Sequence, residues 1–324
     1  MKLSVAMCTY NGARFLREQL ASVAAQTRTP DELIVCDDCS QDETPQIVEA
    51  FAAEAPFDVR LQRNAANLGS TKNFEQAIRL CDGHLIALSD QDDVWLPEKL
   101  ETLEAELARR PTAGLVFSDA DVVDENLRPL GFRLWQATGE ANFGEAKQKL
   151  FREGMAFDVL LAGNVVTGAT MAFRAEYREL LLPIPGDTSL IHDGWIAMLL
   201  AAVSELAFIS RPLIKYRQHA AQQLGAYHGP ASAGGLKAMR RANPYASELH
   251  RLMTLAERLR AKRAAFDGAA ALAKLNEKAA HLRARMEISR AGLGRVPRIA
   301  RELLTRRYHL YSNGVYSAAK DLFS

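Results

Sequence analysis

The 324-residue sequence has no long uninterrupted apolar run, which excludes a typical membrane-spanning helix. Its longest apolar stretch, residues 195–209, is broken by Ser204 and Glu205, whereas a bilayer span needs roughly 18 or more apolar residues. The first residues also lack the charged segment, the long apolar segment and the cleavage site of an export signal. We therefore expect a cytoplasmic protein.

Two common nucleotide-binding motifs are missing as well. No G-x-G-x-x-G follows the first predicted strand and no G-x-x-x-x-G-K-[ST] occurs, which disfavours a Rossmann dinucleotide site and a P-loop NTPase. Cysteine is scarce, since the four cysteines (Cys8, Cys36, Cys39 and Cys81) are too few for a disulfide framework in a chain of this length. Cys36 and Cys39 have C-x-x-C spacing but no second pair for a zinc site. We expect reduced thiols.

Charge is unevenly distributed, although the formal net charge is only +1. Residues 1–236 contain 21 Lys and Arg against 32 Asp and Glu, whereas residues 237–324 contain 19 against 7. A basic C-terminal region suits a partner that presents phosphates, either nucleic acid or the anionic face of a membrane. The two parts meet in a Gly-, Pro- and Ala-rich stretch, residues 226–236, which is typical of a linker.

Short apolar runs alternate with amphipathic segments through the first 120 residues, which predicts βαβ units around a mostly parallel sheet. Strands are predicted at 3–7, 33–36, 59–61, 85–88, 115–117, 171–173, 207–209 and 213–216. Helices are predicted at 14–25, 44–51, 74–81, 97–107, 150–161 and 195–203, then at 249–263, 269–288 and 296–304. Residues 124–147 are predicted to form a loop. This pattern predicts an α/β catalytic domain at 1–225, a linker at 226–236 and a basic helical region at 237–324.

Three polar clusters directly follow predicted strands, at residues 9–12, 37–42 and 90–93. Polar residues at the carboxyl ends of parallel strands line the crevice where such sheets bind ligands. The carboxylates of Asp90, Asp92 and Asp93 lie on one turn and repel one another unless a cation holds them together. Aspartate oxygens match the coordination of Mg²⁺ or Mn²⁺.

The segments VAMCTYNGARFLREQLASVAAQT, IVCDDCSQDET, NLGSTKNF, SDQDDVWLPEKL, TGATMAFR, IHDGW and YRQH occur in this order. The chain thereby resembles the family-2 glycosyltransferases of GT-A fold, and more narrowly their bacterial rhamnosyltransferase-like members. The resemblance covers residues 1–225, and the tail more weakly. It implies a GT-A nucleotide-diphospho-sugar transferase fold, with a mostly parallel central sheet flanked by helices.

The resemblance implies a nucleotide-sugar site made of Thr9, Tyr10, Asn11, Asp37, Asp38, Asn67, Gly69, Lys72, Asn73, Asp90, Gln91 and Asp92. It leaves open which of Asp37 and Asp38 meets the base or ribose. It also implies a bound Mg²⁺ or Mn²⁺ held by Asp92, with His219 completing the metal shell. In an alternative alignment Asp93 is a metal ligand.

Asp193, in the segment His192-Asp193-Gly194-Trp195, resembles the family's catalytic base. An inverting transfer needs one carboxylate to accept the proton of the attacking hydroxyl. On local sequence alone, the N-cap of the following helix is the favoured interpretation of Asp193, and the resemblance reverses this preference. The resemblance further implies acceptor contacts from Thr167, Gly168, His192 and Trp195, although Thr167 and Gly168 also suit a tight turn, and Trp195 also suits a core position.

The expected donor is dTDP-L-rhamnose, with UDP-hexoses as the alternative, and the expected acceptor is a saccharide or a lipid-linked saccharide. The pathway expected is the assembly of a surface polysaccharide, such as the O-antigen of lipopolysaccharide. The basic tail then binds the cytoplasmic face of an anionic membrane, packs on the catalytic domain or forms a homodimer. Three rival functions remain: a sugar-1-phosphate nucleotidyltransferase, a nucleic-acid-binding protein and a non-catalytic nucleotide-sugar-binding subunit. We expect no nucleic-acid partner, because such a role leaves Asp90–Asp93 and Asp193 unexplained.

Overall fold

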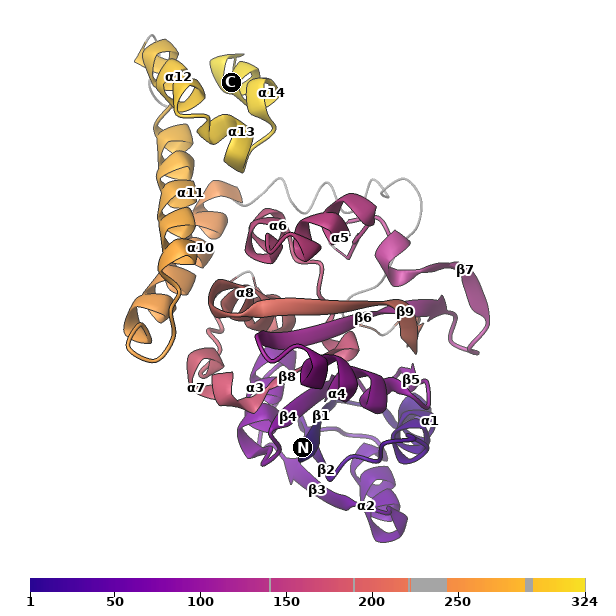
Figure 1. Cartoon of the computed structure of the whole chain (residues 1–324). Coiled ribbons are helices and arrows are strands. Elements are labelled where there is room, and N and C mark those ends of the chain that lie inside the picture. Colours follow the sequence, from indigo (N-terminus) through magenta and orange to yellow (C-terminus); the bar gives the residue numbers. More distant parts are fainter. Residues whose placement is uncertain (140, 189, 221, 223–243, 289–293, 324) are drawn as a thin grey trace. The chain divides into compact units, whose positions relative to one another are not determined.

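The computed structural model describes residues 1–139, 141–188, 190–220, 222, 244–288 and 294–323 (Figure 1). The chain divides into two compact units, Met1–Gly186 with Ile191–Ala231, and Asp187–Leu190 with Ser232–Ser324. The predicted linker at 226–236 lies outside the described residues. Within the part that the structure describes, no helix combines the length and apolar character needed to cross a membrane.

The first unit is built on a mixed sheet that has nine strands in the described part of the chain. The strands are β1 (Leu3–Thr9), β2 (Glu32–Asp37), β3 (Asp58–Arg63), β4 (Leu85–Ser89), β5 (Val94–Trp95), β6 (Ala113–Val123), β7 (Pro129–Arg133), β8 (Met171–Arg174) and β9 (Glu205–Arg217). Their order is β3-β2-β1-β4-β8-β6-β9-β5, with β7 paired to β6. Only β5, β7 and β8 run against the common direction. This confirms the predicted α/β fold with a mostly parallel sheet.

Helices pack on the sheet in two groups (Figure 1). The first group is α1 (Ala13–Ala24), α2 (Thr44–Glu54) and α4 (Lys99–Arg109), and the second is α3 (Ser70–Leu80) and α8 (His192–Val203), with α6 (Ala156–Ala162) and α7 (Arg178–Leu181) packed on α8. Helix α5 (Glu145–Arg152) contacts α6. Short 3₁₀ turns lie at Leu134–Gln136, Gly168–Thr170 and Ala175–Tyr177. The two groups leave the carboxyl edge of the sheet open to form a site.

Four predicted elements differ from the structure. The helix predicted at 150–161 is two helices, α5 and α6, because Gly154 has a φ of +78°, a left-handed conformation that ends a helix. The strands predicted at 207–209 and 213–216 form one strand, β9, whose pairing with β6 shifts register beside Pro212. The predicted loop at 124–147 contains strand β7 and the start of α5.

The carboxyl ends of β1 and β4 lie side by side in the sheet. Both strands are buried along their whole length, and Met7 of β1 pairs with Ser89 of β4. The residues that follow them, 9–12 and 90–93, therefore meet at one edge. This adjacency brings two of the three polar clusters together.

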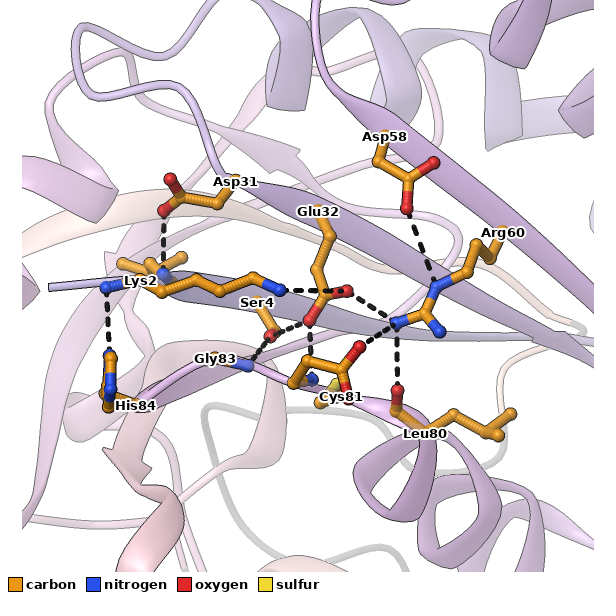
Figure 2. Close-up of polar contacts among 12 residues, drawn as sticks. Lys2, Ser4, Asp31, Glu32, Asp58, Arg60, Leu80, Cys81, Gly83 and His84 are labelled. Atoms are coloured by element: carbon orange, nitrogen blue, oxygen red, sulfur yellow. Dashed lines mark hydrogen bonds and ion pairs between the residues drawn. The ribbon is translucent and has the colours of Figure 1, made fainter.

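At the opposite, amino edge of the sheet, β2 begins with a buried carboxylate, Glu32 (Figure 2). It accepts hydrogen bonds from the hydroxyl of Ser4, from the Arg60 guanidinium and, at 2.6 Å, from the backbone amide of Asp82. Burial alone would raise the pKa of Glu32, but the hydrogen bonds from Ser4, Asp82 and Arg60 outweigh it and lower the pKa below its usual value. This network joins β1, β2 and β3 to the end of α3.

We expect Glu32→Gln to lower the free energy of unfolding at pH 7 by about 1–3 kcal/mol, because donors around Glu32 lose a charged acceptor. The folded-state pKa lies below the unfolded one, so this stabilisation is present above about pH 4.3 and disappears as the pH falls through the folded pKa. The difference between wild type and variant should therefore narrow in acid. Urea unfolding at pH 7 and at about pH 3.5 measures it.

Tryptophan fluorescence isolates this effect, because all three tryptophans (Trp95, Trp135 and Trp195) are buried in the first unit. Glu54→Gln is the matched control, since Glu54 is exposed at the end of α2. A difference between Glu32→Gln and wild type that stays constant from pH 7 to pH 3.5 would contradict the proposed charge network.

The second unit is helical, as predicted for the C-terminal region. Its helices are α10 (Pro244–Ala261), α11 (Ala269–Ile288), α12 (Arg295–Leu304), α13 (Arg307–Tyr311) and α14 (Gly314–Phe323). The long helices α10 and α11 pack against each other, and α12, α13 and α14 gather beyond the end of α11 (Figure 1).

Candidate functional site

A pocket of about 420 Å³ lies at the carboxyl edge of the sheet, next to β1, β2 and β4. Most of the residues predicted to form a site line this pocket: Thr9, Tyr10, Asp38, Asn67, Gly69, Asn73, Asp90, Gln91, Asp92, Thr167, Gly168, His192 and Asp193. The structure therefore brings the donor-side and acceptor-side candidates into one cavity, although they come from segments up to about 180 residues apart.

The turn after β4 supplies two pocket carboxylates, Asp90 and Asp92. Burial, together with the negative charges of Asp92 and Asp193, raises the pKa of Asp90 to about 7, while the charge of Lys99 opposes the shift. Four carboxylates, those of Asp38, Asp90, Asp92 and Asp193, thus line one cavity with a single cationic side chain, that of Arg217. Such a cavity favours binding of a positively charged group.

Asp93 points away from this cavity into the protein interior. Its Oδ1 accepts a hydrogen bond of 3.1 Å from the backbone amide of Arg217, and its Oδ2 has no hydrogen-bond partner among the described residues. Burial, with the charges of Asp92 and Asp90, raises its pKa well above the usual value. Asp92 both lines the pocket and contacts His219, whereas Asp93 is bonded to the Arg217 amide outside the pocket, so the geometry favours Asp92 as the metal ligand over the alternative Asp93.

The Lys99 side chain is fully buried beneath the acidic turn. Its Nζ donates a 2.6 Å hydrogen bond to the Ala169 carbonyl and lies 3.6 Å from the ring centre of Trp95. Burial lowers the pKa of Lys99 well below its usual value, while Asp93 and Asp90 oppose this shift. Lys99 was not among the predicted site residues, although its position one turn before Leu103 and two before Leu107 indicates the buried face of α4.

Arg217, at the end of β9, is the second buried cation behind the turn. Its Nε donates a 2.6 Å hydrogen bond to the Asp92 carbonyl, one terminal nitrogen donates to the Glu125 carbonyl, and the other pairs with the Glu18 carboxylate. The guanidinium carbon also lies 4.5 Å from the ring centre of Phe15. Arg217 therefore fixes the backbone of the acidic turn, a role that the sequence analysis did not assign.

Asp92 and His219 form a close pair. The Oδ2 of Asp92 lies 2.8 Å from Nε2 of His219, and the His219 ring packs against Phe15 with a centre-to-centre distance of 4.8 Å. His219 is not a lining residue itself, but it follows Arg217 at the end of β9 and is half of this pair. The predicted link between the acidic turn and the distant YRQH segment is thus a direct contact.

Within the described residues, no three His, Cys, Asp or Glu side chains are grouped so that they could hold a metal ion. The pair of Asp92 and His219 still fits a divalent cation, because such a cation commonly takes one or two protein ligands and completes its shell with substrate phosphates and water. The 2.8 Å separation of the two ligand atoms is close to the roughly 3 Å expected between neighbouring ligands around Mg²⁺.

Gln91 joins the ends of β1 and β4. Its Oε1 accepts a 2.8 Å hydrogen bond from the Tyr10 amide, and its Nε2 donates one of 3.1 Å to the Tyr10 carbonyl. A Cβ atom at Gly12 would lie 2.1 Å from Gln91 Oε1, so a side chain at position 12 would displace the Gln91 amide from this arrangement. Asn11 lies outside the pocket, with a φ of +47°, and its Oδ1 accepts from the Gln41 amide. Gln91 and Asn11 thus shape the pocket backbone.

The pair Asp37 and Asp38 divides into an internal and a pocket residue. Asp37 is buried outside the pocket, where its carboxylate accepts hydrogen bonds from the Thr9 hydroxyl and from the amide and hydroxyl of Ser40. Asp38 lines the pocket. Of the two candidates for contact with a base or ribose, only Asp38 is in a position to reach it.

Asp38 also orders the loop that precedes α3. Its carboxylate accepts hydrogen bonds from the amides of Leu68 and Gly69, at 2.7 and 2.8 Å, and from the Asn64 side chain at 2.9 Å. Gly69 has a φ of +79°, which favours glycine at this N-cap. This loop therefore forms a fixed wall of the pocket.

Two predicted nucleotide contacts at α3 have other partners. The side-chain nitrogen Nδ2 of Asn73 donates a 2.8 Å hydrogen bond to the Cys36 carbonyl. Asn73 therefore holds α3 to β2, and it also lines the pocket. The Lys72 ammonium lies outside the pocket and is bonded to the Glu75 carboxylate at 2.8 Å and to the Ile184 carbonyl. The expected neutralisation of a diphosphate by Lys72 is inconsistent with this placement, because its charge is already paired.

Asp193 is nine-tenths buried at the pocket wall, in the first turn of α8. Its Oδ1 accepts hydrogen bonds from the Gly194 amide and, at 3.3 Å, from the Asn164 side chain. Its Oδ2 accepts a longer one of 3.4 Å from the Gly168 amide. Ile191, not Asp193, is the N-cap of α8, so the simple capping alternative does not describe this residue.

His192 lies beside Asp193 and lines the pocket. Its ring stacks on Phe74 with centres 4.0 Å apart, and its Nδ1 has no hydrogen-bond partner among the described residues. Burial lowers the pKa of His192 to about 3, so its imidazole is neutral at pH 7. A Cβ at Gly168 would lie 2.9 Å from its Nε2. Gly168 and its neighbour Thr167 thus allow the loop before β8 to approach α8 closely.

The expected acceptor contact of Trp195 is wrong. The Trp195 side chain is fully buried, does not line the pocket and donates a 2.8 Å hydrogen bond to the Leu181 carbonyl. The apolar helix α8 is buried from His192 to Leu200, so its tryptophan packs in the core.

A mostly parallel α/β sheet whose carboxyl edge holds an acidic turn and a separate buried carboxylate is typical of enzymes that act on phosphate-bearing ligands. Residues 4–178, more than half of the chain, match the profile described as Glycosyl transferase family 2. The chain therefore belongs to glycosyl transferase family 2.

Similar proteins support this assignment at modest identity. An uncharacterized protein of Mycobacterium tuberculosis is 29% identical over 222 residues, 67% of this chain, and the match spans 59% of that protein. An uncharacterized glycosyltransferase of Nostoc sp. is 29% identical over 225 residues, covering 68% of this chain and 66% of the relative. The dTDP-rhamnosyl transferase RfbG of Shigella flexneri is 25% identical over 229 residues, covering 68% and 74%. This chain thus corresponds to about three-fifths of the mycobacterial relative.

Among solved structures, residues 1–349 of Staphylococcus aureus TarS in complex with UDP-GlcNAc superpose with a TM-score of 0.57. The two chains are 17% identical, and the superposition covers 86% of this chain and 70% of the TarS chain. At this identity the similarity concerns the fold alone. It agrees with the GT-A fold that the sequence motifs imply.

Proposed function

We propose that this chain is a metal-dependent inverting glycosyltransferase that moves a sugar from a nucleoside-diphosphate donor to a hydroxyl of a saccharide acceptor. The observation that carries the proposal is the common pocket of Asp90, Asp92 and Asp193. One pocket thereby combines carboxylates for a metal-bound diphosphate with a carboxylate for proton transfer.

On the donor side, Asp38 and Asp90 bind the nucleoside, with Thr9, Tyr10, Asn67 and Gly69 around it. Two features support this arrangement. All six residues line the pocket, and the backbone around them is fixed by the hydrogen bonds of Asp38 and Gln91. A preformed wall reduces the entropy lost when a ligand binds.

Asp92 and His219 would hold the Mg²⁺ or Mn²⁺ ion that the proposal requires. When bound, this ion supplies Lewis-acid stabilisation of the negative charge on the leaving diphosphate. Arg217 keeps the Asp92 backbone in place by its hydrogen bond to the Asp92 carbonyl. Lys72 adds no positive charge to the pocket, because its ammonium is bonded to the Glu75 carboxylate and the Ile184 carbonyl.

Asp193 accepts the proton of the acceptor hydroxyl as the hydroxyl oxygen bonds to the anomeric carbon and the bond to the diphosphate breaks. The Asn164 side chain and the amides of Gly168 and Gly194 orient its carboxylate. Neutral His192 lies next to it and lines the pocket on the acceptor side. The displacement occurs in one step, so the anomeric configuration inverts.

The donor we propose is dTDP-L-rhamnose, and the acceptor is a saccharide or lipid-linked saccharide of a cell-surface polysaccharide. The similarity to a protein named dTDP-rhamnosyl transferase supports this donor, at 25% identity. A UDP-sugar is the alternative, since the structurally similar TarS chain was solved with UDP-GlcNAc.

A thermal-shift screen with UDP, dTDP, GDP and CDP, each with and without Mn²⁺, tests the donor. A ligand that binds only the folded state raises the unfolding midpoint, and a ligand at about 100 times its Kd stabilises that state by about 2.7 kcal/mol. We expect the largest shift with dTDP and Mn²⁺ together, followed on tryptophan fluorescence as a readout of the first unit.

The pattern of shifts separates the alternatives. A preference for UDP would retain the transfer reaction and replace rhamnose by a UDP-linked sugar. No metal-dependent shift with any of the four nucleotides, at concentrations up to several millimolar, would argue against a nucleotide-sugar donor.

A further inference from the structure

The last thirty described residues, 294–323, form a small separate cluster of helices that we call the C-terminal tip. Helices α12, α13 and α14 enclose a core of Ile299, Tyr308 and Ala318 against Ile288 at the end of α11 (Figure 1). The tip is held together chiefly by this core and by two buried polar networks.

Both carboxylates of the tip, Glu302 and Asp321, are buried and paired with side chains of α11. Glu302 lies 2.7 Å from Nδ1 of the buried His281, and Asp321 forms a two-pronged ion pair with Arg285 at 2.7 and 2.9 Å. Asp321 also accepts a hydrogen bond of 2.8 Å from the Tyr308 hydroxyl. Within residues 294–323, no carboxylate is therefore left on the surface.

Helix α14 exposes its apolar side and buries its small and polar side, the reverse of an ordinary surface helix. It buries Ser317, Ala318 and Asp321 and exposes its apolar residues. The exposed side chains are Val315, Tyr316, Ala319, Leu322 and Phe323, which at 100° per residue form one continuous stripe on the helix. An amphipathic helix that packs its small and polar side inward leaves its apolar side for another partner.

The same pattern continues on α12 and α13. Large apolar side chains on the three helices are more than half exposed, from 57% for Val296 to 86% for Phe323: Val296, Leu304, Leu310, Val315, Tyr316 and Phe323. Exposed basic residues lie between them along the chain, namely Arg298, Arg301, Arg306 and Lys320. Arg298 is 3.5 Å from Glu287 on α11, an exposed pair.

We propose that the C-terminal tip binds the surface of an anionic lipid bilayer, with the α14 stripe in the headgroup and acyl boundary and the arginines at the lipid phosphates. An apolar stripe flanked by basic residues is the usual composition of helices that lie in a membrane interface. The tip offers no surface carboxylate that would repel anionic lipids.

A second copy of the chain fits the tip less well. A symmetric contact through the same face would bring the basic residues of two copies together, with no exposed carboxylate in the tip to balance them. A membrane surface supplies both an apolar layer and the opposite charge. The inference does not depend on which sugar the catalytic unit transfers.

The test is co-sedimentation of the full chain with vesicles of phosphatidylcholine alone or mixed with phosphatidylglycerol, without any sugar donor. We expect binding to the mixed vesicles, and we expect Tyr316→Ser with Phe323→Ser to weaken it about tenfold or more. The matched control is Leu130→Ser with Met253→Ser, which removes two exposed apolar side chains elsewhere.

A second pair of variants tests the charge. Arg298→Gln with Arg301→Gln should weaken binding at low salt, whereas Arg79→Gln with Arg109→Gln, which changes the net charge equally, should not. This comparison also stands if the serine variants disturb α14. Wild type that stays in the supernatant with mixed vesicles, or equal binding by the tip variants and their controls, would overturn the proposal. So would a dimer that Tyr316→Ser with Phe323→Ser dissociates in light scattering while vesicles remain unbound.

Discussion

Asp193→Asn should lower kcat for sugar transfer by about 10²–10⁴-fold, the usual contribution of a general base. The affinity for the nucleoside diphosphate should change by no more than about twofold, because the lost group acts in the transition state and not in donor binding. Single-turnover transfer and calorimetric titration of the nucleotide measure the two quantities.

The structure explains why this substitution is specific. An asparagine at 193 has the size of aspartate, and its side-chain oxygen still accepts from the Gly168 amide or from Asn164. The neighbouring Gly168 packs so closely that even a Cβ atom on it would lie 2.9 Å from the His192 ring, so this part of the pocket tolerates only substitutions that keep the side-chain size. The pocket should therefore keep its shape while it loses the atom that accepts the proton.

Asp58→Asn is the matched control, because Asp58 lies at the amino edge of the sheet, exposed, beside Arg60 (Figure 2). It should retain wild-type kcat. Transfer by Asp193→Asn at more than about a tenth of the wild-type rate would exclude Asp193 as the base. Loss of nucleotide binding in that variant would instead assign Asp193 to the donor site.

The core of the site follows from the sequence because local rules position it. Strands β1 and β4 are continuous apolar runs, and each ends where a polar cluster begins. The carboxyl ends of neighbouring parallel strands meet at one edge of a sheet, so Thr9 and Asp90 were expected at one crevice. Strand order does not decide which of two adjacent side chains faces the crevice, so the sequence leaves Asp37 and Asp38 as equal candidates. In the structure the Asp37 carboxylate is bonded to Ser40.

Buried charges were not predictable in this way. Arg217 reaches Glu18 across 199 residues and the Asp92 carbonyl across 125, so only the tertiary fold brings them together. The full burial of Lys99 over Trp95, at the start of a predicted helix, was likewise not predicted. Burying a charge is costly unless other groups compensate it. Here the positive charge of Lys99 reduces the repulsion among the carboxylates of the acidic turn.

Helix α8 shows a second limit. Its residues from His192 to Leu200 are buried on every side, so apolar periodicity cannot identify which of them face a cavity. His192 and Asp193 line the pocket, whereas Trp195, two positions further on, is in the core. Sequence motifs gave the segment, and packing decided the individual roles.

Asp92→Ala should abolish the gain in nucleotide affinity that Mn²⁺ provides. Asp92 is the carboxylate of the acidic turn that both lines the pocket and contacts His219, at 2.8 Å. Since removing even an indirect metal-supporting group commonly costs 10–100-fold in metal affinity, we expect a loss of about 100-fold or more for this ligand. Calorimetric titration of UDP or dTDP with and without Mn²⁺ measures it.

Asp93→Ala is the informative comparison, because Asp93 is adjacent in sequence yet lies outside the pocket and is bonded to the Arg217 amide. Asp93→Ala should lower the free energy of unfolding of the first unit, while Mn²⁺ still increases the nucleotide affinity of the folded variant. Asp58→Ala serves as the control for loss of a carboxylate at the far edge of the sheet. Nucleotide binding by Asp92→Ala with the full Mn²⁺ effect, or loss of that effect in folded Asp93→Ala alone, would move the metal from Asp92 to Asp93.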